Sequence, residues 1–152
     1  MNRRTSREQA FMLVFEKSFH REIPMRELIS IAAETRDDEY DHYLGERDLD
    51  SFALMISLNI EAKFEEIDKI ISGHSQRWAT KRLSRVSLAV LRLALFEIFN
   101  LESIPTSVSI NEAVELAKKY GGEEDFSFVN GLLGSIVRNP EYGLDAAGDK
   151  YV

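Results

Sequence analysis

The sequence predicts an all-α protein; two observations support this class and a third supports a single domain. Apolar residues recur every three to four positions along most of the chain, which is the spacing of one face of a helix. No run alternates between apolar and polar residues in the manner of a strand bounded by hairpin turns. The chain has 152 residues, of which 44% are hydrophobic, so it can form one domain with an ordinary core.

The first half of the chain predicts three helices. Thr5 and Glu8 are suited to a capping box that opens the first helix, and a shorter amphipathic helix follows it. Asp48 or Asp50 then caps a long third helix with a continuous apolar face. These three helices form an N-terminal subdomain of about residues 1–73.

The second half predicts four helices in a subdomain of about residues 74–139. A short helix lies around residues 77–83. The next helix, over residues 86–101, is apolar on nearly every side, so we expect it to lie centrally with neighbours around it. Two amphipathic helices complete a single domain of residues 1–139. Beyond it the helical pattern stops, and residues 140–152 are expected to form a flexible tail.

The charge of the chain is unevenly distributed. The net charge is −7, and residues 34–50 account for −6 of it with eight acidic and two basic residues. The remaining 135 residues therefore sum to −1, and two stretches of them are locally basic. One contains Arg3, Arg4 and Arg7; the other runs from Lys69 to Phe96 without an acid and carries Lys69, Arg77, Lys81, Arg82, Arg85 and Arg92. Local clusters attract phosphate more effectively than the total charge indicates, because distant charges are screened by salt.

No residue pattern indicates catalysis or a cofactor. The chain has no phosphate-binding glycine loop, no nucleophile elbow and no cysteine, and its three histidines lie far apart in the sequence. We therefore expect a binding module and not an enzyme, with no metal and no cofactor. No signal peptide or membrane-spanning run is present, which favours a cytoplasmic protein without membrane contact.

Several phrases of the chain resemble the NusB family of bacterial transcription antitermination factors. The resemblance extends over most of residues 1–139 and rests on Arg3-Arg-Thr-Ser-Arg-Glu8, Ala89-Val-Leu-Arg-Leu-Ala94 with Glu97, Pro105, Ile110-Asn-Glu-Ala113, Leu116-Ala-Lys118, Gly121 and Phe128-Val-Asn-Gly131. It implies seven helices, three in an N-terminal and four in a C-terminal subdomain. It also implies binding of a single-stranded boxA-type leader RNA together with NusE, a ribosomal small-subunit protein. The pair would join the RNA polymerase antitermination complex and suppress termination, notably in ribosomal RNA operons.

The resemblance also implies which residues contact RNA. They are arginines and a lysine that neutralise phosphate and an aromatic ring on which a base can stack, namely Arg3, Arg4, Arg7, Arg92, Lys118 and Phe128. Four further cations could contact either RNA or the protein partner: Arg77, Lys81, Arg82 and Arg85.

Simpler interpretations of these residues stay open. Phe128 could pack in the core, and Arg92, the only cation of its helix interior, could form an internal salt bridge with the acidic loop.

Two other functions are also open. One is a helical adaptor that binds only proteins, and the other is the NusB-like domain of a ribosomal RNA methyltransferase. The resemblance further admits a homodimer.

Overall fold

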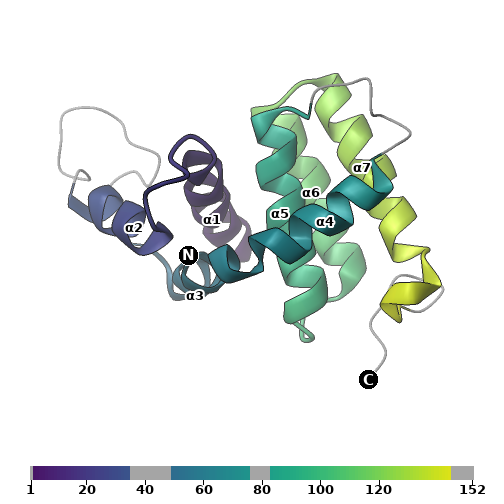
Figure 1. The fold of residues 1–152 in the computed structure, drawn as a ribbon, viewed down its shortest axis with the longest axis horizontal. Helices are drawn as coiled ribbons and strands as arrows, with labels where there is room; N and C mark the ends of the chain where they lie inside the picture. The colour runs from purple at the N-terminus through teal and green to yellow at the C-terminus, as the bar shows by residue number, and fades with distance from the viewer. Residues whose placement is uncertain (1, 35–48, 76–82, 145–152) are drawn as a thin grey trace. The chain divides into compact units, whose positions relative to one another are not determined.

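The all-α prediction is confirmed. The computed structural model describes residues 2–34, 49–75 and 83–144, and these residues form seven α-helices (Figure 1). The helices are α1 (Arg3–Lys17), α2 (Met25–Glu34), α3 (Ser51–Ile60), α4 (Phe64–His74), α5 (Arg85–Asn100), α6 (Thr106–Tyr120) and α7 (Glu123–Val137). Two short 3-10 turns, Glu61–Lys63 and Pro140–Tyr142, accompany them. No helix in these described ranges is long and apolar enough to cross a membrane.

The chain forms two compact units that divide between Ala62 and Lys63. The first contains α1 to α3 and the second α4 to α7, whereas the prediction counted the α4 segment as part of the third N-terminal helix and a helix around residues 77–83 as the first C-terminal one. The division near residue 73, however, falls too late in the chain. The long third helix is interrupted by the 3-10 turn Glu61–Lys63, after which α4 packs against α5 and α7. The short helix predicted around residues 77–83 lies almost entirely outside the described residues.

In the first unit, α1 packs against both α2 and α3. Its inner residues Phe11, Leu13 and Val14 are at most 1% exposed, as is Ile56 of α3. The cap of α1 differs from the predicted Thr5–Glu8 box. Asn2 is the N-cap, and its side-chain oxygen accepts a hydrogen bond of 2.9 Å from the Thr5 backbone N–H. The helix thus starts three residues earlier, since a preceding asparagine satisfies the free N–H groups as well as threonine does.

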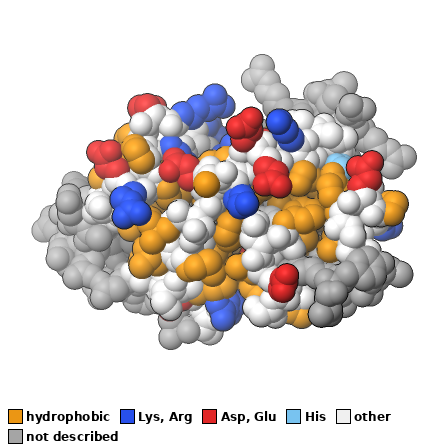
Figure 2. Space-filling view, turned by 60° about the horizontal axis from the view of Figure 1, so that its bottom comes forward, with side chains coloured by type: hydrophobic (Ala, Val, Ile, Leu, Met, Phe, Trp, Pro, Cys, Tyr) orange, Lys and Arg blue, Asp and Glu red, His pale blue; other side chains and the backbone are white. Residues whose placement is uncertain are grey.

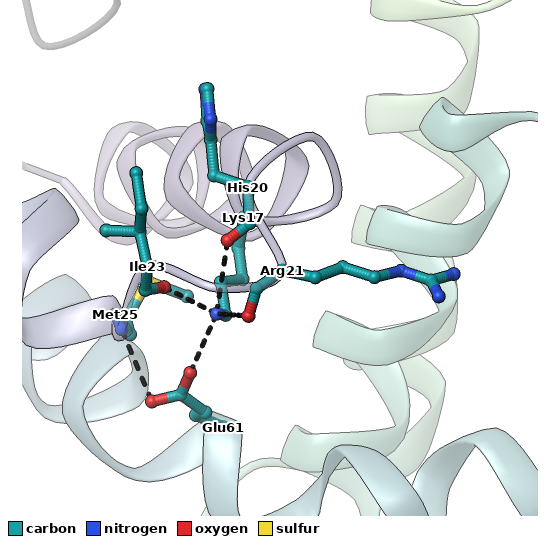
Figure 3. A network of polar contacts seen from close by, with 6 residues as sticks. All are labelled: Lys17, His20, Arg21, Ile23, Met25 and Glu61. Carbon is teal, nitrogen blue, oxygen red and sulfur yellow. Dashed lines mark hydrogen bonds and ion pairs between the residues drawn. The ribbon is translucent and has the colours of Figure 1, made fainter.

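The link between α1 and α2 is held by a buried lysine (Figure 3). The Lys17 ammonium donates to the backbone carbonyls of His20, Arg21 and Ile23 at 3.3, 2.9 and 2.5 Å. It also lies 3.0 Å from a carboxylate oxygen of Glu61, whose other oxygen accepts from the backbone N–H of the first residue of α2. One cation therefore joins the end of α1, the following turn, and the segment after α3.

In the second unit, α5 is the central helix, as its composition predicts. It packs against α4, α6 and α7, and Leu91 and Leu95 are fully buried (Figure 1). Its N-terminus is joined to α7 by Asp125, which accepts hydrogen bonds from the Ser84 and Ser87 hydroxyls at 2.5 and 2.8 Å. Burial alone would raise the pKa of Asp125, but these bonds and one from the Gly122 N–H hold it below its ordinary value.

The predicted flexible tail needs a correction at its start. Asn139 caps the 3-10 turn Pro140–Tyr142, whose tyrosine ring lies 5.5 Å from the ring of His74 and 5.3 Å from that of Phe99. Leu144 is 8% exposed. Tyr142 and Leu144 therefore pack within the second unit, although the helical periodicity does not reveal them. Residues 145–152 lie outside the described part of the chain.

Candidate nucleic-acid interface

The three predicted RNA-binding arginines of the first unit, Arg3, Arg4 and Arg7, lie in the first two turns of α1. Arg3 and Arg4 are exposed, whereas Arg7 is only 3% exposed. The Arg3 guanidinium carbon lies 3.8 Å from the centroid of the Phe52 ring, and that of Arg7 lies 5.8 Å from it. Both distances fall within the range in which an aromatic face attracts a cation. Arg3 and Arg4 can reach a phosphate directly, while Arg7 mainly packs against its neighbours.

A hydrogen-bond cluster holds the start of α3 against this part of α1. One Asp50 carboxylate oxygen accepts from the Ser6 hydroxyl at 2.6 Å and from the Phe52 backbone N–H at 3.1 Å. The side-chain oxygen of Gln9 accepts from the Asp50 backbone N–H at 2.9 Å. The bond from Ser6 is the largest cause that keeps the pKa of Asp50 below its ordinary value. Asp50 is thus the predicted cap of α3 and also fixes Phe52 beside the arginines.

Basic side chains are not gathered into one broad field on the face shown in Figure 2. There, lysine and arginine side chains alternate with acidic and apolar ones. Attraction of phosphate on this face therefore depends on individual cations and on what holds each of them.

In the second unit, Arg92 forms an ion pair inside its own unit. Its Nε and Nη2 atoms donate to the two carboxylate oxygens of Asp68 on α4 at 3.0 and 2.8 Å. Its guanidinium also lies 4.3 Å from the centroid of the Phe64 ring, and its side chain is 13% exposed. An internal salt bridge was one of the two interpretations of this residue, although its partner comes from α4 and not from the acidic loop. The RNA contact of Arg92 stays a prediction.

Lys118 and Phe128 lie near the junction of α6 and α7. The Lys118 side chain is 50% exposed, with its ammonium 3.7 Å from a Glu115 oxygen and 5.3 Å from the centroid of the Phe126 ring. Phe128 is half-buried beside the fully buried Val129. Part of the Phe128 side chain is therefore accessible. The residue is neither fully packed in the core nor fully exposed as a stacking surface.

The additional cations are only partly described. Arg77, Lys81 and Arg82 lie outside the described residues, and Arg85 is exposed in the first turn of α5. Among the residues that the structure describes, no group of three or more histidine or acidic side chains could hold a metal ion.

The predicted site residues therefore fall into separate groups. Arg3, Arg4 and Arg7 belong to the first unit, and Arg92, Lys118 and Phe128 to the second. Within the second unit, Arg92 contacts α4 whereas Lys118 contacts Phe126 of α7.

Sequence reasoning missed the aromatic and acidic partners of these cations: Phe52, Phe64, Phe126 and Asp68. Phe52 and Phe64 occupy apolar positions of the predicted third helix, where periodicity alone indicates only packing.

The phrases that suggested RNA binding extend over both units, and so does the match to known proteins. A model of the NusB family matches residues 4–138. The chain belongs to the NusB family. It is 42% identical to the transcription antitermination protein NusB of Clostridium botulinum strain Loch Maree, over 90% of this chain and 100% of that protein. It is 38% identical to that of Acetivibrio thermocellus, over 91% of this chain and 90% of that protein.

Solved structures give the same result for the fold. NusB from T. maritima superposes with a TM-score of 0.70 at 36% identity, covering 90% of each chain. A chain in a crystal structure of the antitermination factors NusB and NusE in complex with dsRNA has a TM-score of 0.68 at 28% identity. That match covers 88% of this chain and 94% of the other. The helical arrangement described above is thus that of NusB structures.

Proposed function

We propose that this NusB-family protein is a transcription antitermination factor that binds RNA together with NusE. The observation that carries the proposal is the similarity to the chain solved with NusE and dsRNA, which extends over 88% of this protein. The relatives at about 40% identity, all named as antitermination proteins, support the same role. The protein acts by binding and not by catalysis.

The RNA target in this proposal is a boxA-type leader, bound as a single strand. The loaded pair joins the RNA polymerase antitermination complex, and ribosomal RNA operons are the main targets. Exposed arginines and a partly accessible phenylalanine support a single-stranded target, because unstacked bases can lie on an aromatic ring while phosphates pair with guanidinium groups. The related complex was solved with double-stranded RNA, so both forms belong in the test.

The residues proposed to contact RNA differ in how readily they can do so. In the first unit, Arg3 and Arg4 are exposed and provide phosphate contacts. In the second unit, Lys118 provides a further cation and Phe128 the stacking surface. Arg92 would have to share its guanidinium between a phosphate and Asp68, so its contribution is expected to be smaller.

The deciding experiment is a binding titration with and without NusE. The probes are a boxA-type RNA as a single strand, the same RNA as a duplex, and a scrambled single strand of equal length. The proposal expects tighter binding of the boxA-type strand than of the scrambled one. It also expects NusE to increase the RNA affinity, and linkage then requires RNA to increase the NusE affinity by the same factor. Binding of NusE with no RNA affinity under any condition would instead identify a protein-binding adaptor.

Two sets of variants separate phosphate contacts from stacking. Replacement of both Arg3 and Arg4 by alanine should lower the log–log salt slope by about 0.7 for each lost phosphate contact on a single strand. Phe128→Ala should weaken binding with little change of slope, because stacking releases few counterions. If Phe128→Ala instead lowers the unfolding temperature and leaves the RNA affinity of the folded protein unchanged, the residue serves the core.

A further inference from the structure

Phe52 lies under the arginines of α1 although nothing in the sequence assigned it to the interface. We propose that Phe52 is a positioning residue for RNA binding, which orders the Arg3 guanidinium for a phosphate. The inference rests on the proposed function and adds to it a residue on α3 that need not touch RNA itself.

The stacking geometry is compatible with a phosphate contact. The Arg3 guanidinium carbon lies over the Phe52 ring, 3.8 Å from its centroid, which is a contact distance. A guanidinium presents its N–H groups along its edges, in its own plane, where carboxylates and phosphates pair with it. One face of the Arg3 group can therefore rest on the ring while its edges stay available to an anion.

The ring also offsets a repulsion. Arg3 and Arg7 are four residues apart on α1, and like charges at this spacing destabilise a helix. Both guanidinium carbons lie within 6 Å of the same ring, at 3.8 and 5.8 Å. The negative face of the ring attracts both cations and lets them remain near each other.

Phe52 is held independently of Arg3. Its backbone N–H donates to Asp50, and the same Asp50 oxygen accepts from Ser6 of α1 at 2.6 Å. Gln9, one turn further along α1, accepts from the Asp50 backbone N–H. The backbone that carries the ring is thus anchored to the helix that carries the arginines before any ligand arrives.

Ordering before binding has a measurable consequence. A long exposed arginine loses rotamer freedom when it binds a phosphate, and a side chain that is already stacked loses less of it. Without the ring, we expect RNA affinity to fall about two- to tenfold, the range typical of releasing one immobilised side chain.

The test compares four full-length variants in titrations with a boxA-type single-stranded RNA at several salt concentrations. Phe52→Leu removes the ring but keeps an apolar side chain, and Phe52→Tyr keeps an aromatic face. Arg3→Ala removes the cation, and the double variant Arg3→Ala/Phe52→Leu completes a thermodynamic cycle. The control is Phe15→Leu, the same chemical change at a ring of this unit that packs against Phe11 and Phe19.

The proposal expects Phe52→Leu to weaken binding about two- to tenfold with little change of the salt slope, because the Arg3 cation is still present, and Phe52→Tyr to restore the affinity. It expects no additional loss from Phe52→Leu when Arg3 is already alanine, and unchanged affinity for the control. Equal affinity for wild type and Phe52→Leu would overturn the inference and leave the proposed function standing. An equal loss from Phe52→Leu with and without Arg3 would also overturn it, because the ring would then act by another route. If the wild-type protein binds no RNA, the proposed function fails, and the inference fails with it.

Discussion

Replacing Lys17 with methionine should destabilise the first unit more than most single substitutions do. Methionine keeps most of the apolar stem, so the change removes mainly the ammonium. That ammonium donates to three backbone carbonyls within 3.3 Å and pairs with Glu61 at 3.0 Å (Figure 3). Bonds to a charged group contribute about 1.5–3 kcal/mol each when buried. Water can reach part of this turn after the change and replace some of the lost hydrogen bonds. We therefore expect the free energy of unfolding to fall by about 2–4 kcal/mol, which is less than the sum of the four contacts.

Urea unfolding measures the effect, with hydrogen exchange of the α1 to α3 amides to assign it to the first unit. For a slope of about 2 kcal/mol/M, the expected loss lowers the midpoint by about 1–2 M. Lys63→Met is the matched control. Its ammonium lies 4.0 Å from Glu66, both side chains are well exposed, and such pairs contribute about 0–1 kcal/mol.

Glu61→Gln divides the Lys17 interaction into its parts. It removes the charge that pairs with Lys17 but leaves the three carbonyl acceptors, so it should cost less than Lys17→Met. If Lys17→Met lowers the midpoint no more than Lys63→Met does, the assignment of Lys17 as the organising cation of this turn is wrong.

Three further predictions concern stability. Leu95→Ala in the fully buried face of α5 should cost about 2–5 kcal/mol in urea unfolding, and an unchanged midpoint would place α5 at the periphery. Because its folded-state pKa is lowered below 3.8, Asp50 contributes stability that is present above that pH and lost as the pH falls through the lowered value. Ser6→Ala should therefore lower the unfolding temperature at pH 7, and the difference from wild type should shrink below pH 3.8; a constant difference would contradict this. Gly121→Ala should lower the unfolding temperature, since a Cβ there would meet a carboxylate oxygen of α7 at 2.6 Å, whereas Gly73→Ala, with open space, should not.

The extent of the helices was largely predictable, but the break between α3 and α4 was not. Apolar residues continue at helical spacing through the 3-10 turn Glu61–Lys63, so periodicity predicts one helix where the chain has two. What separates them is the partner each one packs against: α1 and α2 for α3, and α5 and α7 for α4. A local pattern carries no information about such a change of partner.

The partners of the cations in the candidate site were also not predictable from local sequence patterns. The sequence identified Arg92 as unusual because it interrupts an apolar helix, and the structure explains it by Asp68, which lies 24 residues earlier. Periodicity could place Phe52 and Phe64 only on an apolar face, although each lies within 4.5 Å of a guanidinium carbon. The contacts of a long, flexible arginine depend on tertiary packing. A single sequence therefore does not show which side chain the arginine will contact.

These contacts bear on how an acidic protein could hold RNA. Arg7 and Arg92 are both largely covered, and Arg92 already donates to a carboxylate. A phosphate that recruited Arg92 would have to compete with Asp68. Among the six residues that the resemblance implies as RNA contacts, the exposed Arg3 and Arg4 and the half-exposed Lys118 are therefore the cations best placed to contribute. Each phosphate contact on a single strand adds a modest, salt-sensitive increment to the binding free energy. With few such contacts, this chain alone should bind RNA weakly, and a protein partner that adds contacts would raise the affinity considerably. If the proposed function holds, the burial of Arg7 and Arg92 is therefore a physical reason to expect that RNA and NusE bind to this protein cooperatively.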